Sequence, residues 1–387
     1  MSSSAKFQSG NILTITIAHL IHDIYTSFLA PILPLLIEKL SVNLSLAGLL
    51  SVIQRIPSLF NPFVGILSEK IKIRFLVIFT PALTALTMSL IGVAPGYTIL
   101  AILLFVCGVS STLFHVPSPV MIKEVSGSRL GKGMSYFMLG GELARTLGPL
   151  IIVATVETWG LGGTLRLIPF GIIASGILYY KLKNIDIRKN FPKSEKEMGY
   201  SSTFIRFLPV FTSLAGITFF RGAMKSALTL YLPVYLTEKG ANLWYAGISL
   251  AILQLAGAAG TYLSGTISDR IGRRTTLVII TVASPLLMLI LISQQSEIYT
   301  LPLLVIIGIF LVAPTSVNLA VVHELETEHT AFVNSIYMAI NFLASSVMVL
   351  LVGILSDNLG LDLTYRISAG IAFIAIFFAL NVPKKKV

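Results

Sequence analysis

Six ionisable side chains stand within long apolar stretches, where a charge is costly: Asp23, Arg55, Glu142, Arg145, Arg221 and Lys225. If those stretches cross a lipid bilayer, each charge near the centre costs at least about 2.5 to 3.5 kcal/mol on insertion scales. Such residues persist mainly where they face a cavity or a partner. They are therefore the first candidates for binding or ion coupling.

Asp23 shares one side of its segment with two histidines. His19, His22 and Asp23 lie at positions i, i+3 and i+4 of a helical period. A desolvated carboxylate whose partners come and go can take up and release a proton. We expect this group to couple the chain's activity to protons, with Glu142 as the competing acid. Each histidine by itself could equally have a hydrogen-bonded structural role.

Two further pairs have informative spacing. Glu142 and Arg145 are three residues apart, so they can pair on one helix face, either for function or only to fix helix packing. Arg221 and Lys225 are four apart and of like charge, which disfavours their closeness unless an anion lies between them. This spacing favours an anionic ligand.

Arg55 has no acid within one helical turn, so its partner must come from another helix, with Asp23 or Glu142 as the intramembrane choices. Polar residues elsewhere in the apolar stretches, such as Asn318 and Asn341, are interpreted as cavity lining, with hydrogen bonding between helices as the alternative. The substrate-binding residues predicted on these grounds, and on the resemblance described below, are Arg55, Arg145, Arg221, Lys225, His115, Tyr25, Gln254, Asn318 and Asn341.

The composition excludes a soluble fold. Of 387 residues, 55% are hydrophobic and only 12% are charged, about half the charged share of soluble domains. A spanning helix needs about 20 apolar residues, and the predicted spans lie near 12–37, 44–67, 75–94, 98–122, 134–156, 164–182, 204–236, 244–267, 275–293, 301–323, 331–356 and 364–381. The sequence therefore predicts an all-α membrane protein with twelve transmembrane helices.

Motifs for other chemistry are missing from the sequence. A single cysteine, Cys107, excludes a disulfide framework, and no Cys/His cluster has metal-ligand spacing, so we expect no metal site and no cofactor. Neither a GK[ST] phosphate loop nor a G-x-S-x-G motif occurs. ATP-driven pumping and enzymatic activity are therefore not expected.

Basic residues define the expected orientation. If both termini are cytoplasmic, twenty of the 28 Lys and Arg residues fall in inner loops and four in outer loops. We therefore predict cytoplasmic termini in the inner membrane of a prokaryote. The high isoelectric point then reflects topology, and no nucleic-acid partner is expected.

The chain divides into two similar halves. A polar loop at 183–203 separates an N-terminal six-helix bundle (1–182) from a C-terminal one (204–387). The halves repeat at an offset of 199 to 200 residues, as in Pro34-Leu35 against Pro233-Val234, Glu38-Lys39 against Glu238-Lys239, Gln54 against Gln254 and Gly65 against Gly265. Two parallel six-helix repeats are a transporter architecture.

The loop after the eighth span carries the most specific motif. The segment 265–274, GTISDRIGRR, resembles the G-x-x-x-D-R-x-G-R-[RK] loop of the major facilitator superfamily, and it lies between spans 8 and 9 as in that family. The corresponding segment 65–74, GILSEKIKIR, departs from the pattern at Glu69 and Lys72. The resemblance implies gating roles for Gly65, Glu69, Arg74, Gly265, Asp269, Arg270, Arg273 and Arg274.

The glycine and the carboxylate of this motif have properties that suit a gating role. Glycine lets helices approach closely, and the carboxylate can cap a neighbouring helix or pair with arginine on the cytoplasmic side. Contacts of this kind favour one gate state.

Four patches resemble the fosmidomycin-resistance group of drug/proton antiporters within this superfamily. They are His19 with His22-Asp23 and the segment 31–34, the segment 114–117 around His115, Gly140-Gly141 with the segment 147–150, and Arg221. Gly148-Pro149 is also similar to the antiporter motif of span 5, although Ala144 replaces its earlier glycine. The resemblance implies a site role for His115 and favours antiport.

Together these patterns predict a secondary transporter that rocks two bundles around a central site. We expect a monomeric, proton-coupled exporter of a small organic anion or drug. The alternatives are an importer or uniporter of sugar-like or anionic nutrients, and a lipid-scrambling or signalling protein on the same fold.

Overall fold

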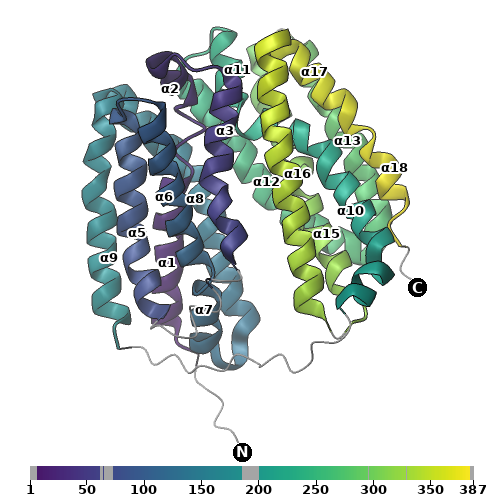
Figure 1. Cartoon of the computed structure of the whole chain (residues 1–387), viewed down its shortest axis with the longest axis horizontal. Helices are drawn as coiled ribbons and strands as arrows, with labels where there is room; N and C mark the ends of the chain where they lie inside the picture. The colour runs from purple at the N-terminus through teal and green to yellow at the C-terminus, as the bar shows by residue number, and fades with distance from the viewer. Residues whose placement is uncertain are drawn as a thin grey trace, which may run out of the picture. The chain divides into compact units, whose positions relative to one another are not determined.

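The computed structural model describes residues 7–61, 64, 73–184, 200–294, 296–327 and 329–383. These parts of the chain form helices joined by short turns and contain no strand. Residues 185–199 of the predicted loop at 183–203 lie outside the described residues, and a helix already begins at Tyr200, so the predicted bundle boundaries remain a prediction. The all-α fold predicted from composition is confirmed (Figure 1).

Ten helical segments are long and apolar enough to cross a membrane, or eleven if one bent pair counts as a single span, within the part of the chain that the structure describes. The bent pair joins Leu33–Leu40 to Leu44–Phe60 at an angle of 119°. Helix α1 (Ser9–Thr26) covers only the first part of the span predicted near 12–37, whose end falls in α2 (Leu33–Leu40), and it is not among the ten. His19, His22 and Asp23 are among the polar residues that lower its mean hydropathy.

The chain separates into two compact units. The first contains residues 1–42, 50–193 and 242–251, and the second contains 43–49, 194–241 and 252–387. Helices of the first unit, with η for short 3-10 segments, are α1, α2 (Leu33–Leu40), the second half of α3 (Leu44–Arg55), η1 (Ile56–Phe60), α5 (Ile73–Leu90), η2 (Ile91–Val93), α6 (Tyr97–His115), α7 (Ser118–Ser126), η3 (Gly127–Arg129), α8 (Leu130–Trp159), η4 (Leu161–Leu167) and α9 (Ile168–Leu182).

In the first unit, α1 packs against α8, α5 and α9. Its core gathers buried side chains from these helices and from α6 and α7, among them Ile12, Ile15, Ile78, Phe114 and Met121. One face of α1 is therefore enclosed, and the polar residues on it must find partners within the protein.

Helices of the second unit are α10 (Tyr200–Thr229), α11 (Leu232–Glu238), most of α12 (Leu243–Ile271), α13 (Arg273–Ser293), η5 (Glu297–Tyr299), α14 (Thr300–Val312), α15 (Pro314–His323), α16 (Thr330–Leu359), α17 (Leu361–Ala372) and α18 (Ala375–Leu380). Helix α10 is central to this unit and packs against α16, α17 and α18. The core contains Leu214, Ile217, Leu277 and Val317.

Prolines explain where several predicted spans break. Pro117 precedes α7 and Pro314 begins α15, so the fourth and tenth spans are each two helices. Pro233 stands in the first turn of α11, and the predicted span at 204–236 is in fact α10 followed by a separate short helix. Proline removes a backbone donor and is tolerated mainly in a first helical turn.

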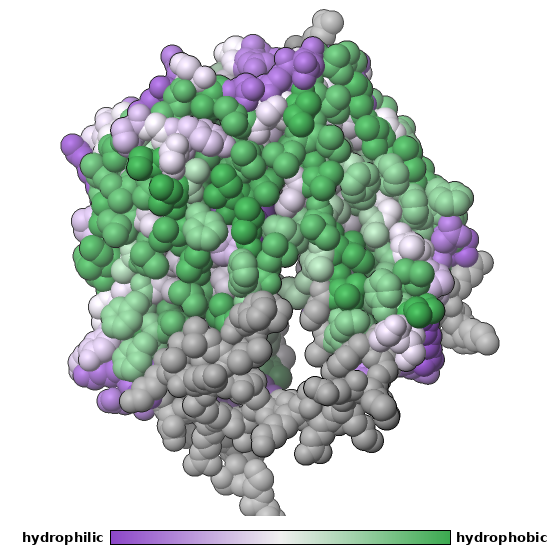
Figure 2. Space-filling model, viewed as in Figure 1, coloured by the Kyte–Doolittle hydropathy of each residue, from purple (hydrophilic) through white to green (hydrophobic). Residues whose placement is uncertain are grey.

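Large apolar side chains cover the outside of the helices. Phe79, Phe170 and Ile173 are each more than half exposed. In the view of Figure 2, hydrophobic residues occupy the middle of the surface and hydrophilic residues gather near its upper and lower edges. This distribution is expected of helices that face lipid.

Candidate functional site

The carboxylate of Asp23 lies among three imidazoles in the first unit. Its Oδ1 is 2.9 Å from His22 Nδ1 and 3.1 Å from His115 Nε2, and its Oδ2 is 3.1 Å from His19 Nε2. Asp23, His19 and His22 are buried on α1, whereas the His115 side chain from the end of α6 is 38% exposed. We call these four residues the Asp23 cluster.

His19 uses both of its ring nitrogens. Its Nδ1 lies 2.7 Å from the backbone oxygen of Phe137. A carbonyl oxygen only accepts, so Nδ1 must carry a hydrogen. In a neutral imidazole, Nε2 would then present a lone pair to the Asp23 oxygen, which is also an acceptor. The short contact between these two atoms therefore requires a positive species, such as an additional proton.

Glycines of α8 bring its backbone close to α1. A Cβ at Gly141 would lie 2.7 Å from His19 Cε1, and one at Gly140 would lie 2.6 Å from the Thr16 backbone oxygen. Both positions exclude a side chain without movement of the neighbouring helix. This close approach places the Phe137 carbonyl beside His19. In the sequence these glycines carried only a family resemblance, and their contact with α1 was missed.

Aromatic rings orient the two buried histidines. His22 stacks on Phe114 with ring centroids 4.4 Å apart, and His19 stacks on Phe137 at 4.0 Å. His115 stands in the last turn of α6, where the carbonyl end of the helix dipole favours a positive charge. The two helices α1 and α6 therefore supply all the imidazoles around Asp23.

Glu142 and Arg145 form the pair that their spacing indicates. Arg145 Nη1 donates to Glu142 Oε1 at 2.9 Å, with side chains that are 47% and 26% exposed. Arg55 is exposed at the end of α3. Within the described residues it has no ion pair with Glu142 or Asp23, so the expected partner from another helix is not found.

The second unit buries Arg221 of α10. Its Nη2 donates to Ser284 Oγ at 3.1 Å and to the Phe310 backbone oxygen at 2.9 Å, with a longer contact of 3.5 Å to the Leu311 oxygen. These acceptors are all uncharged. Arg221 Nε is buried and has no hydrogen-bond partner in the part of the chain that the structure describes.

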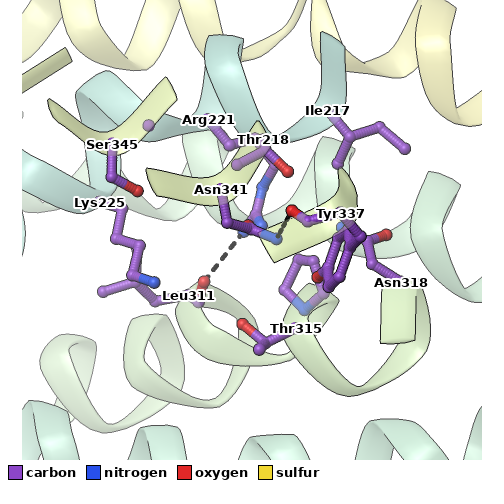
Figure 3. A pocket seen from close by; sticks show the side chains of 12 residues that line it. Ile217, Thr218, Arg221, Lys225, Leu311, Thr315, Asn318, Tyr337, Asn341 and Ser345 are labelled. Atoms are coloured by element: carbon purple, nitrogen blue, oxygen red, sulfur yellow. Dashed lines mark hydrogen bonds between the residues drawn. The ribbon is translucent and has the colours of Figure 1, made fainter. Parts of the chain in front are cut away.

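Arg221 lines a pocket that we call the Arg221 pocket (Figure 3). Its walls come from α10, from the break between α14 and α15, and from α16; the polar and charged lining residues are Thr218, Arg221, Lys225, Thr315, Asn318, Tyr337, Asn341 and Ser345. The volume of this cavity is about 40 Å³, which is enough for a few water molecules. None of these lining residues is acidic.

Four of the predicted substrate residues thus meet at one place: Arg221, Lys225, Asn318 and Asn341. The Oδ1 of Asn318 is buried and has no hydrogen-bond partner among the described residues, so a ligand or a water would satisfy it. Asn341 Nδ2 donates to the Tyr337 backbone oxygen at 3.0 Å. Ser284, a direct partner of Arg221, carried no recognisable signal in the sequence.

The other five predicted substrate residues lie outside this pocket: Arg55, Arg145 and His115, whose positions are given above, and Tyr25 and Gln254. Tyr25 donates its hydroxyl to the Leu167 backbone oxygen at 2.6 Å and packs on Phe28. Gln254 is partly buried on α12 and is not a lining residue of the Arg221 pocket. Their roles in binding stay predictions.

The loop between α12 and α13 contains an ion-pair network. Arg273 Nη2 lies 2.6 Å from Asp269 Oδ1 and 2.9 Å from Glu324 Oε1, and Arg273 also donates to Ser268 Oγ. Gly272 turns the chain between the helices with φ of +90°, a conformation that favours glycine. The arginine pairing expected for Asp269 is present. Glu324, at the end of α15, was missed because it is distant in sequence.

Gly265, the first glycine of the motif at 265–274, does not lie at a close contact between helices. A Cβ at Gly265 would meet only Ser316 Oγ, at an ordinary distance of 3.9 Å. The tight approach lies five residues earlier, where a Cβ at Gly260 would clash with the backbone of Ile309 on α14. The expectation of close packing at Gly265 is therefore wrong for this structure.

The remaining predicted gating residues take no part in the ion pairs of this loop that are described above. Arg270 is exposed and Arg274 is partly buried at the start of α13. Arg74 stacks over the Phe75 ring at 5.2 Å. Gly65 and Glu69 lie outside the described residues.

The fold and the two buried ionisable sites define a multi-pass membrane transporter rather than an enzyme. Residues 15–344 and 264–387 match the model of the Major Facilitator Superfamily, and the chain belongs to that superfamily. Its predicted family membership is confirmed.

Several known proteins are similar over most of the chain. The fosmidomycin resistance protein of Escherichia coli (strain K12) is 25% identical over 378 residues, which cover 95% of this chain and 91% of that protein. The multidrug resistance protein MdtG of Salmonella typhi is 24% identical over 280 residues, 68% of each chain.

Solved structures agree on the fold. A bacterial homologue of the human lysosomal transporter Spinster, in an inward-facing and occupied conformation, has a TM-score of 0.82 at 13% identity and covers 97% of each chain. The D-xylose–proton symporter has a TM-score of 0.73 at 15% identity and covers 98% of this chain and 99% of its own.

Proposed function

We propose that this chain is a proton-coupled exporter of a small organic anion, acting as a monomer in the inner membrane of a prokaryote with both termini in the cytoplasm. The observation that carries the proposal is the Arg221 pocket. A guanidinium keeps its charge at any physiological pH, so burial obliges it to find compensating groups.

An anionic substrate would supply that compensation. Arg221 donates hydrogen bonds to a serine hydroxyl and to backbone carbonyls, and the described residues that line the pocket contribute no carboxylate. Lys225, one turn along α10, adds a second positive charge to the same lining. Carboxylate or phosphonate groups accept charge-assisted hydrogen bonds from such side chains.

Coupling to protons rests on the Asp23 cluster. The contact between His19 Nε2 and Asp23 Oδ2 requires a hydrogen between the two atoms, which either a protonated carboxyl group or an imidazolium provides. A proton shared there is held between groups that both titrate, which suits uptake on one side of the membrane and release on the other. His115 is partly exposed and offers the route by which the proton arrives.

Export is favoured by the relatives. Those with the clearest names are resistance proteins for fosmidomycin and for multiple drugs. A resistance protein in this superfamily protects a cell by moving a compound outward, so we propose the same direction for this chain.

Everted membrane vesicles with a preset pH gradient test the proposal. Addition of a transported organic anion should dissipate the gradient, and a panel of phosphonates, carboxylates and neutral sugars in proteoliposomes should show preference for the anions. Uptake of neutral sugars alone would contradict the anion assignment. Lipid movement without solute transport would contradict transport itself.

A further inference from the structure

We propose that the Asp23 cluster also binds one divalent transition-metal ion, with zinc as the best fit, through His19 Nε2, the Asp23 carboxylate and His115 Nε2. The sequence gives no reason to expect a metal site, because its ligands come from two separate helices. In the structure, these three residues each offer a ligand atom, and the atoms all lie within 4.8 Å of one another.

The distances suit a small dication. Zinc binds imidazole nitrogen at about 2.0 to 2.1 Å and carboxylate oxygen at about 2.0 to 2.2 Å. Tetrahedral coordination then places ligand atoms roughly 3.3 to 3.5 Å apart. Asp23 Oδ2 is 3.1 Å from His19 Nε2, and Oδ1 is 3.1 Å from His115 Nε2. Both separations are within a few tenths of an ångström of the tetrahedral value, and the His19 and His115 nitrogens lie within 4.8 Å of each other.

The surrounding groups hold the ligands in the required form. His19 Nδ1 donates to the Phe137 carbonyl at 2.7 Å, which leaves the Nε2 lone pair directed at the Asp23 carboxylate. His22 Nδ1 lies 2.9 Å from Asp23 Oδ1 and can donate to it. Metal-binding histidines and carboxylates typically have such supporting hydrogen bonds, which fix the tautomer and the ring orientation.

The donor set also selects the metal. Two imidazoles and one carboxylate favour zinc or a neighbouring transition metal over magnesium and calcium, which prefer oxygen ligands alone. Three protein ligands leave a fourth position for water, as in open zinc sites. The exposed fraction of His115 gives the ion access to that position.

A functional consequence follows, and it rests on the proposed function. Metal and proton would occupy the same place between His19 and Asp23, so zinc should inhibit proton-coupled transport. The metal site itself depends on geometry alone and can be tested without transport.

The test uses the full chain without a polyhistidine tag, purified in detergent and freed of metal. Zinc is titrated by calorimetry and by competition with a chromophoric chelator, and cobalt is added separately to record its visible absorption. The variants are His115→Ala and Asp23→Asn. The control is His323→Ala/His329→Ala, because these are the remaining two of the five histidines and Glu324 and Glu326 stand near them in sequence.

We expect one zinc per chain, with affinity at least about 10-fold weaker in His115→Ala and in Asp23→Asn. The control variant should keep the wild-type affinity, and the cobalt form should show the absorption of a four-coordinate site. X-ray absorption of the zinc-loaded wild type should report two imidazole ligands, a readout that does not depend on how the variants fold.

Equal affinity in wild type and His115→Ala would overturn the site, as would loss of binding in the control variant. Absence of zinc binding to the wild type would overturn it directly. Proton coupling, measured separately with a chelator present, tests the proposed function by itself. Zinc binding with no proton coupling would refute that function and leave the metal site intact.

Discussion

The Asp23 cluster and the Arg221 pocket both bury an ionisable group, but they stabilise it in different ways. Asp23 contacts three imidazoles, each of which can gain or lose a proton. Arg221 donates to a serine hydroxyl and to backbone carbonyls, which cannot titrate. The charge of the first site is therefore adjustable, whereas that of the second is constant.

This difference separates the two tasks of a coupled transporter. A site whose charge can change can also exchange a proton, because histidine side chains gain and lose protons near physiological pH. A site of constant positive charge cannot do so, but it can attract an anion throughout the cycle. The comparison predicts that variants of the two sites fail in different measurements.

The largest effect is expected for Asp23→Asn. The amide keeps the shape of the protonated acid but cannot release a proton, so proton-driven accumulation should be abolished. Exchange of solute down its own gradient should stay partly intact. A pH-sensitive dye in proteoliposomes measures the first and labelled solute measures the second. Near-normal proton movement would remove the distinction between the two sites.

Arg221→Ala should weaken binding of an anionic substrate by about 1.5 to 3 kcal/mol, because a charge-assisted hydrogen bond is lost. A neutral solute should lose much less. Arg145→Ala is the matched comparison, since Arg145 is paired with Glu142 and is about half exposed. We expect Arg145→Ala to lose less anion affinity than Arg221→Ala, as measured by binding titration.

A melting-temperature measurement on the same two variants sharpens the comparison. If Arg145 acts mainly as the partner of Glu142, its removal should lower thermal stability by leaving that acid unpaired. Unchanged anion affinity in both variants would remove the basis for an anionic substrate.

Gly141→Ala tests how tightly α8 holds the Asp23 cluster. The added methyl group would lie within 2.8 Å of two His19 ring atoms, and overpacking of this kind typically costs about 1 to 3 kcal/mol of stability. Gly265→Ala is the control, since its Cβ meets only Ser316 Oγ at 3.9 Å. Alanine there should be neutral, or stabilising by up to about 1 kcal/mol. Equal melting temperatures would show that the glycine contact on α1 is not tight.

The smallest effect on binding is expected for Asp269→Asn. The residue is 65% exposed, pairs with Arg273 and lines neither site, so turnover should slow while substrate affinity stays near that of the wild type. Glu324 still holds Arg273, so the loss should be partial. Transport rate and binding affinity measured on one preparation test this; a collapse of affinity with normal turnover would contradict a gating role.

Residue type and local spacing were enough to predict the helical membrane fold and the contacts within single helices. Apolar stretches of the right length predicted the helical membrane protein, and the pairing of Glu142 with Arg145 followed from their separation of three residues. The place of Arg221 and Lys225 in one lining also followed from their spacing along α10. Such properties are readable because helical geometry relates neighbours in sequence to neighbours in space.

Tertiary packing alone decided the contacts between helices. The position of His115 against Asp23, the Phe137 carbonyl against His19, and Glu324 against Arg273 each join segments more than 50 residues apart. Side-chain pattern along one helix does not specify the rotation and depth at which another helix meets it, because ridges and small residues on both surfaces determine that fit. The sequence by itself therefore determined which charges stand within apolar stretches. The packing of the helices decided that Asp23 and Arg221 are buried whereas Arg55, Arg145 and Lys225 are exposed, and it decided which groups contact the buried charges.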